Sequence, residues 1–77
     1  MMVLYSKPDC RYCDLLKQNL ESRNLYFIEL KIGTDILRNE FRNKFPDVKT
    51  VPYLILANGD THTYSSWMLL TEPKEKT

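Results

Sequence analysis

The sequence has little of several features, and each shortage excludes a class of protein. Two cysteines in 77 residues are too few for a small secreted domain held together by several disulfides. No apolar run approaches the roughly 20 residues that a membrane helix needs. The chain contains no repeat, linker or low-complexity segment, and a composition of 43% apolar and 27% charged residues excludes a disordered or fibrous protein. Eleven basic and ten acidic residues give a net charge of +1, so no charge excess predicts nucleic acid or an anionic membrane as a partner.

The length of the chain predicts one small domain, residues 1–77, with residues 72–77 as a loose charged tail. A core of this size leaves roughly 3–5 kcal/mol of net stability. It has no room for a large enclosed pocket, so a ligand is expected in a surface groove. The start, Met1 to Tyr5, lacks a basic leader and a small-residue cleavage site, which predicts a cytoplasmic protein. A monomer is expected.

Strand-forming and helix-forming segments alternate along the chain and predict an α/β fold in the order β-α-β-α-β-β-α. Strands are predicted over residues 3–5, 25–32, 51–57 and 60–64, and helices over about 10–23, from 34 or 35 to near 45, and over 67–70. Asn58-Gly59 is the strongest hairpin signal and makes the last two strands antiparallel. The helical crossover between the first two strands makes them parallel, so the sheet is predicted to be mixed.

Polar residues before the helices predict where each helix begins. Asp9 is the predicted N-cap of the first helix. Thr34 or Asp35 is the predicted N-cap of the second helix, and Ser65 or Ser66 that of the short last helix.

The two cysteines, Cys10 and Cys13, open a helix directly after a strand. A cysteine at a helix N-terminus faces unpaired N–H groups and the positive end of the helix dipole, which favours the thiolate, and Lys7 and Arg11 add positive charge. Cys13 lies one turn further on, on the apolar face, and is expected to keep its proton. Cys10 is therefore predicted to attack a disulfide, and Cys13 to resolve the mixed disulfide.

Two other interpretations of the cysteines are weaker. The strand–helix context disfavours two incidental cysteines, one of them a core residue. A structural zinc site needs four ligands, and only His62 is available besides the pair, so no metal is expected.

The segment from Tyr5 to Cys13 resembles the active-site segment of dithiol glutaredoxins, and Thr50-Val51-Pro52 resembles the Thr-Val-Pro loop of that family. The resemblance runs from about residue 2 to residue 70. It implies a single glutaredoxin-like domain with a thioredoxin fold, in which helices cover both faces of a four-stranded mixed sheet. It also implies that the protein is a thiol–disulfide oxidoreductase that uses glutathione as co-substrate.

The same resemblance assigns further site residues. Lys7 and Tyr12 would flank the glutathione groove, with Thr50 in the adjoining loop. Val51 would pair its backbone with the cysteine of glutathione, as an added strand pairs with a sheet edge. Pro52 would be a cis proline. The implied partners are glutathione and disulfide-containing proteins, with ribonucleotide reductase as a possible target.

The sequence departs from the family pattern at three places. Arg11 replaces a proline between the two cysteines, and the last helix is short. The Gly-Gly pair and acidic residue that hold the glutamyl end of glutathione are absent. At a helix start, Ser65 or Ser66 offers a hydroxyl and backbone N–H groups to that carboxylate instead.

These departures leave alternatives open. The first alternative is a glutaredoxin-like redoxin reduced by thioredoxin reductase, and the second is a glutathione-assisted iron–sulfur carrier with Cys10 as ligand. A further cationic group, Arg42, Lys44 and Lys49, is interpreted as solvated charges rather than as a site for the glycyl carboxylate of glutathione.

Overall fold

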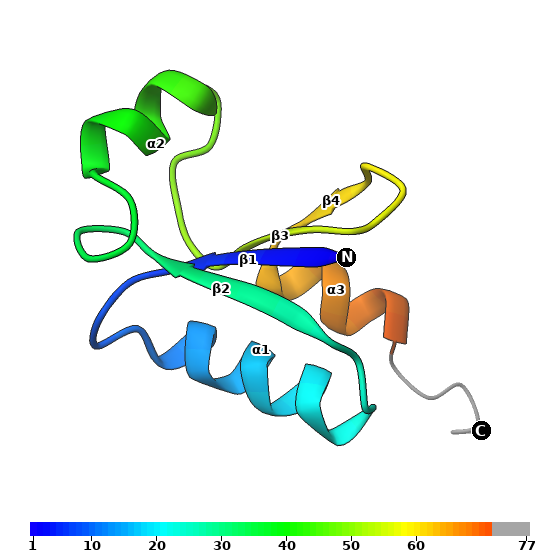
Figure 1. Ribbon diagram of the computed structural model, residues 1–77. Helices are drawn as coiled ribbons and strands as arrows, with labels where there is room; N and C mark the ends of the chain where they lie inside the picture. Colours follow the sequence, from blue (N-terminus) through cyan, green and yellow to red (C-terminus); the bar gives the residue numbers. More distant parts are fainter. Residues whose placement is uncertain (72–77) are drawn as a thin grey trace.

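The computed structural model describes residues 1–71 and contains the predicted order of strands and helices (Figure 1). Its elements are β1 (Met2–Ser6), α1 (Arg11–Ser22), β2 (Phe27–Lys31), α2 (Arg38–Lys44), β3 (Tyr53–Ile55), β4 (Thr61–His62) and α3 (Tyr64–Thr71). The tail predicted to be loose, residues 72–77, lies outside the described residues.

The sheet is mixed, with the strand order β2-β1-β3-β4. β1 is parallel to β2 and antiparallel to β3, and β3 is antiparallel to β4. The predicted α/β fold with a mixed four-stranded sheet is therefore confirmed, including the hairpin around Asn58-Gly59. In this turn the side chain of Asn58 accepts a hydrogen bond from the N–H of Asp60 at 2.9 Å.

Helices cover both faces of the sheet, with α1 and α3 on one side and α2 on the other (Figure 1). Successive strand residues point to opposite faces of the sheet. Neighbouring pairs on β1 and β3 therefore contribute to two different layers, one on each face. Leu4, paired with Leu54, belongs to the buried cluster with residues of α1 and α3, namely Leu16, Leu20 and Trp67. Tyr5, paired with Tyr53, belongs to an aromatic cluster on the α2 face with Phe41 and Phe45.

The predicted N-caps of the first two helices are wrong. Asp9 adopts a left-handed backbone with φ 57°, and Cys10 caps α1 instead, with its sulfur accepting from the N–H of Cys13. Thr34 and Asp35 lie in a turn, where the Asp35 carboxylate accepts from the N–H of Lys31 at 2.9 Å. A short polar side chain that bonds a nearby backbone group competes with helix formation, so α2 begins later, after Leu37.

The last strand and the last helix also differ from the prediction. β4 spans only Thr61–His62, and α3 begins at Tyr64 rather than near residue 67. Thr63 precedes α3, and its hydroxyl accepts from the N–H of Ser66 while the Ser66 hydroxyl accepts from the N–H of Thr63. This reciprocal pair is a capping box with serine in the usual place of Glu or Gln, so Ser65 and Ser66 lie inside the first turn.

Within residues 1–71, no helix combines the length and the apolar character required to cross a membrane.

Candidate active site

Cys10 and Cys13 form a disulfide at the start of α1, with their Cα atoms 5.2 Å apart. The N–H of Cys13 points at the sulfur of Cys10, at an N···S distance of 3.1 Å. The helix therefore offers a backbone donor to the sulfur of its own N-cap residue. When the disulfide is reduced, the same donor stabilises negative charge on Cys10.

The two sulfur-bearing side chains differ in their access to solvent. Cys10 is 9% exposed and Cys13 is 1% exposed, because Cys13 lies one turn into α1 on its buried face. Of the two cysteines, Cys10 is therefore the one more accessible from solvent.

Two surface pockets are lined by residues that neighbour the cysteines in the sequence, although neither cysteine lines them. Thr50 and Val51 line both pockets. The larger pocket, about 590 Å³, includes Lys7, Pro8 and Asp9 from the loop before Cys10. The smaller pocket, about 210 Å³, is lined by Tyr12, Thr50, Val51, Pro52, Thr63, Tyr64 and Ser65. Asp9, before Cys10, and Tyr12, after it, thus line different pockets, and the two pockets share Thr50 and Val51.

The structure brings most of the sequence-predicted site residues together around these pockets. Tyr12, Thr50, Val51, Pro52 and Ser65 share the smaller pocket, and Lys7 lines the larger one. The Val51–Pro52 peptide bond is cis, as the resemblance implies.

Ser66 does not line either pocket. Its hydroxyl is engaged with the N–H of Thr63 and lies 3.0 Å from Nδ1 of His62. Tyr64 reaches the smaller pocket, and its ring packs against that of Tyr12, with 4.8 Å between the ring centroids. Two aromatic rings therefore lie at the rim of this pocket.

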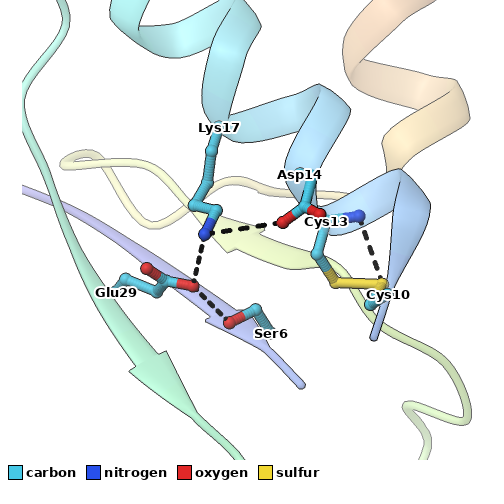
Figure 2. The surroundings of a disulfide bond; sticks show 6 residues. All are labelled: Ser6, Cys10, Cys13, Asp14, Lys17 and Glu29. Atoms are coloured by element: carbon cyan, nitrogen blue, oxygen red, sulfur yellow. Dashed lines mark hydrogen bonds and ion pairs between the residues drawn. A yellow bond between two sulfur atoms is a disulfide. The ribbon is translucent and has the colours of Figure 1, made fainter. Parts of the chain in front are cut away.

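A chain of polar side chains runs beside the disulfide, as Figure 2 shows. The buried hydroxyl of Ser6 donates to a carboxylate oxygen of Glu29 at 2.7 Å. The same oxygen lies 3.1 Å from Nζ of Lys17, whose other acidic partner is Asp14 at 3.6 Å. These contacts connect β1, β2 and α1 on the side of the sheet that holds the cysteines.

This network shifts the pKa of both of its central groups. Partial burial by itself raises the pKa of Glu29, but the Ser6 hydroxyl and the Lys17 ammonium outweigh burial and lower that pKa below 4.5. Burial likewise disfavours the charge on Lys17, yet the carboxylate of Glu29 holds the pKa of Lys17 above 10.5. Both groups are therefore charged at neutral pH and stabilise the fold.

Replacing Glu29 is expected to reveal this stabilisation. Glu29→Ala leaves the Ser6 hydroxyl, only 1% exposed, without its acceptor. It should lower the free energy of unfolding by about 1–3 kcal/mol. Glu29→Gln should cost less, because its amide oxygen still accepts from Ser6. Urea unfolding at pH 7, followed by the fluorescence of the single tryptophan, measures both.

The pH dependence gives an independent check. Because the folded-state pKa of Glu29 is depressed, its contribution is present above the ordinary value of 4.5 and is lost as the pH falls through the folded value. Glu29→Gln should therefore lose less stability than the wild type on acidification. Glu21→Ala, which replaces an exposed acidic residue on α1, is the control. An equal loss of unfolding free energy at pH 7 in Glu21→Ala and Glu29→Ala would contradict the prediction.

Sequence reasoning missed this network and two further residues. Ser6, Lys17 and Glu29 are far apart in the chain, and only the pairing of β1 with β2 brings them together. Arg38 lines the larger pocket, and no motif near it in the sequence predicts this position. Thr63, in contrast, could have been found, since Thr63 and Ser66 have the spacing of a capping box.

In the part of the chain that the structure describes, no three His, Cys, Asp or Glu side chains are grouped closely enough to hold a metal ion.

Comparison with known proteins agrees with this geometry. The glutaredoxin family model matches residues 2–62, a stretch that contains both cysteines and the Thr50–Pro52 loop. A relative from Clostridium pasteurianum is 28% identical over 54 residues, which cover 70% of this chain and 72% of the relative. That relative is described as an uncharacterized glutaredoxin-like 8.6 kDa protein in a rubredoxin operon.

Among solved structures, the thioredoxin-like protein BC3987 is similar, with a TM-score of 0.68 and 22% sequence identity. The match covers 82% of this chain and 85% of that one. A variant of the same protein gives the same TM-score and identity. These likenesses confirm the thioredoxin-like fold.

Proposed function

The chain belongs to the glutaredoxin family, and from this premise we propose that it is a glutathione-dependent oxidoreductase that reduces protein disulfides and glutathione mixed disulfides. The observation that carries the proposal is the Cys10–Cys13 disulfide at the start of α1, where a backbone N–H points at the sulfur of Cys10, the more exposed cysteine. A cysteine pair in this position can exchange two electrons with a substrate without any other group.

The reaction follows from the order in which the two sulfurs are reached. The Cys10 thiolate attacks one sulfur of a substrate disulfide, forms a mixed disulfide and releases the other sulfur as a thiolate. Deprotonated Cys13 then attacks the sulfur of Cys10, forms the Cys10–Cys13 disulfide and releases the second substrate thiolate. The released thiolates take up protons. Two electrons pass from the dithiol to the substrate.

Glutathione restores the dithiol in two further exchanges. One glutathione thiolate attacks the sulfur of Cys10 and releases Cys13, which takes up a proton. A second glutathione thiolate attacks the glutathione sulfur of that mixed disulfide, giving oxidised glutathione and the Cys10 thiolate. The proposal places the protein in a reducing compartment such as the cytoplasm, where glutathione is kept reduced.

Glutathione would lie along the Thr50–Pro52 loop, across the smaller pocket. The Val51 backbone would pair with its cysteine, as in the addition of a strand to a sheet edge, between Lys7 and Tyr12. The glutamyl carboxylate would meet the start of α3, where the N–H groups of Tyr64 and Ser65 are first-turn donors without partners in the helix. Ser66 would support this site through its bond to Thr63 rather than by direct contact.

A second candidate reductant is thioredoxin reductase, and one observation favours it. The paired rings of Tyr12 and Tyr64 line the pocket that would receive the glutamyl end, and the hydroxyl of Ser66 is already engaged. With that end poorly held, a flavoenzyme would supply the electrons to the same dithiol. The disulfide-containing target, for which ribonucleotide reductase is a candidate by family resemblance, would be unchanged.

A coupled assay separates the two reductants. We expect bis(2-hydroxyethyl) disulfide to be reduced at the expense of NADPH when glutathione and glutathione reductase are present. Cys10→Ser is the inactive control. Turnover with thioredoxin reductase and none with glutathione would assign the second reductant.

The position of bound glutathione is tested separately by NMR. In Cys13→Ser carrying glutathione on Cys10, we expect the amides of Lys7, Tyr12, Val51 and residues 64–66 to shift relative to the free protein. Shifts at the first three residues with residues 64–66 unchanged would show that the start of α3 does not hold the glutamyl end.

A further inference from the structure

The larger pocket is strongly cationic. Its lining contains four cationic side chains, Lys7, Arg38, Arg42 and Lys49, and a single acidic one, Asp9. These residues come from three segments: the loop before Cys10, helix α2 and the loop before Thr50. The pocket therefore carries three net positive charges, whereas the whole chain carries a formal charge of +1.

Within residues 1–71, no ion pair neutralises the cations of the larger pocket. Across residues 1–71, the ion pairs of the structure join Lys17 to Asp14 and Glu29, and none includes a cation of the larger pocket. Arg38, Arg42 and Lys49 are all exposed. Clustered cations without acidic partners favour an anionic ligand, because they raise its local concentration and speed its association.

The larger pocket also has apolar residues in its lining, and it lies close to the cysteines in the sequence. Ile32, Phe41 and Val48 line it together with the cations. It shares Thr50 and Val51 with the smaller pocket, and Asp9 is adjacent in sequence to Cys10. A polypeptide whose disulfide lies at Cys10 would therefore place its neighbouring residues in this pocket.

From these observations we propose that the larger pocket binds an acidic polypeptide segment that flanks the disulfide to be reduced, so that this redoxin selects protein disulfides with carboxylates beside them. The inference rests on the proposed oxidoreductase function and adds the substrate class. Glutathione carries a single glycyl carboxylate, which would match only one of these cations. A segment with several Asp or Glu side chains and an occasional apolar residue matches the charges and the apolar side together.

The test uses the reduced full-length protein in a single turnover without glutathione. Three peptides carry the same Cys-Gly-Gly-Cys disulfide, flanked by three glutamates, three serines or three lysines, and their ends are acetylated and amidated. Acid quenching followed by chromatography gives each rate. At low salt we expect the acidic peptide to react about tenfold faster than the serine peptide, and the lysine peptide to be the slowest. High salt should bring the three rates together.

Variants locate the effect. In the triple variant Arg38→Gln, Arg42→Gln, Lys49→Gln, the preference for the acidic peptide should disappear while the rate with the serine peptide stays unchanged. Lys49→Gln alone should reduce the preference about twofold to threefold. Lys44→Gln is the matched control, because Lys44 lies at the end of α2 with its ammonium over the Phe45 ring and does not line the pocket.

Each outcome is decisive. Equal rates for the three peptides in the wild type would overturn the inference and leave the oxidoreductase function intact. A loss of preference as large in Lys44→Gln as in Lys49→Gln would also overturn it, because net charge rather than the pocket would then be responsible. Failure to reduce even the serine peptide would instead contradict the proposed function.

Discussion

Replacing Cys10 by serine is expected to lower the rate of disulfide reduction to that of the uncatalysed reaction. Cys10 is the more exposed of the two cysteines, and its sulfur accepts a hydrogen bond from the backbone N–H of Cys13. A serine hydroxyl at this position is not ionised at neutral pH and forms no mixed disulfide. The coupled assay with bis(2-hydroxyethyl) disulfide measures the loss.

Cys13→Ser is the matched variant, and it should behave differently. Its Cys10 still attacks a substrate, but no second thiol resolves the product, so a mixed disulfide should accumulate and be visible by mass spectrometry as one added substrate thiol. Reduction of a peptide disulfide, which needs both thiols, should stop. If Cys10→Ser forms the mixed disulfide and Cys13→Ser does not, the two roles are reversed.

Trp67→Ala is expected to unfold the protein at 25 °C. The indole is buried in the cluster that joins α1, α3 and the sheet, and its Nε1–H donates to Oδ1 of Asn19 on α1 at 2.9 Å. Truncation of a buried tryptophan costs about 3–5 kcal/mol, and a domain of this size has roughly 3–5 kcal/mol in total. Circular dichroism at 222 nm should show the loss of helix.

Two variants show which part of the indole matters. Trp67→Phe keeps the apolar ring and removes the bond to Asn19, so it should fold with a stability lower by about 0.5–1.5 kcal/mol. Leu69→Ala, on the same helix but 71% exposed, should change stability by less than about 0.5 kcal/mol. A folded Trp67→Ala with near-native thermal stability would contradict the prediction and show that α3 contributes little to the core.

The order of the elements could be predicted because its signals are local. Apolar residues at helical spacing within residues 10–23, the β-prone run over 25–32 and Asn58-Gly59 each depend on residues a few positions apart. The position of Cys10 and Cys13 at a helix start directly after a strand was also predictable, because it follows from the same short stretch.

The N-caps were harder to predict because several polar residues compete for each helix start. Asp9 and Cys10 are adjacent candidates, and Asp9 adopts the left-handed backbone of the preceding turn, which leaves the sulfur of Cys10 as the cap. At α3 the reciprocal bonds of Thr63 and Ser66 move the start one turn toward the N-terminus. A propensity scale ranks residue types and does not choose between neighbours.

By itself, the sequence determined the order of strands and helices, the mixed sheet and the position of the cysteine pair at the start of α1. The tertiary structure alone decided the Ser6–Glu29–Lys17 network and the cationic pocket, which joins Lys7 to Arg38 and Lys49. The reason is strand register: side chains alternate between faces with a period of two, so a slip of one residue would move Glu29 to the opposite face. Contacts between distant segments form only when the strands pair in one register.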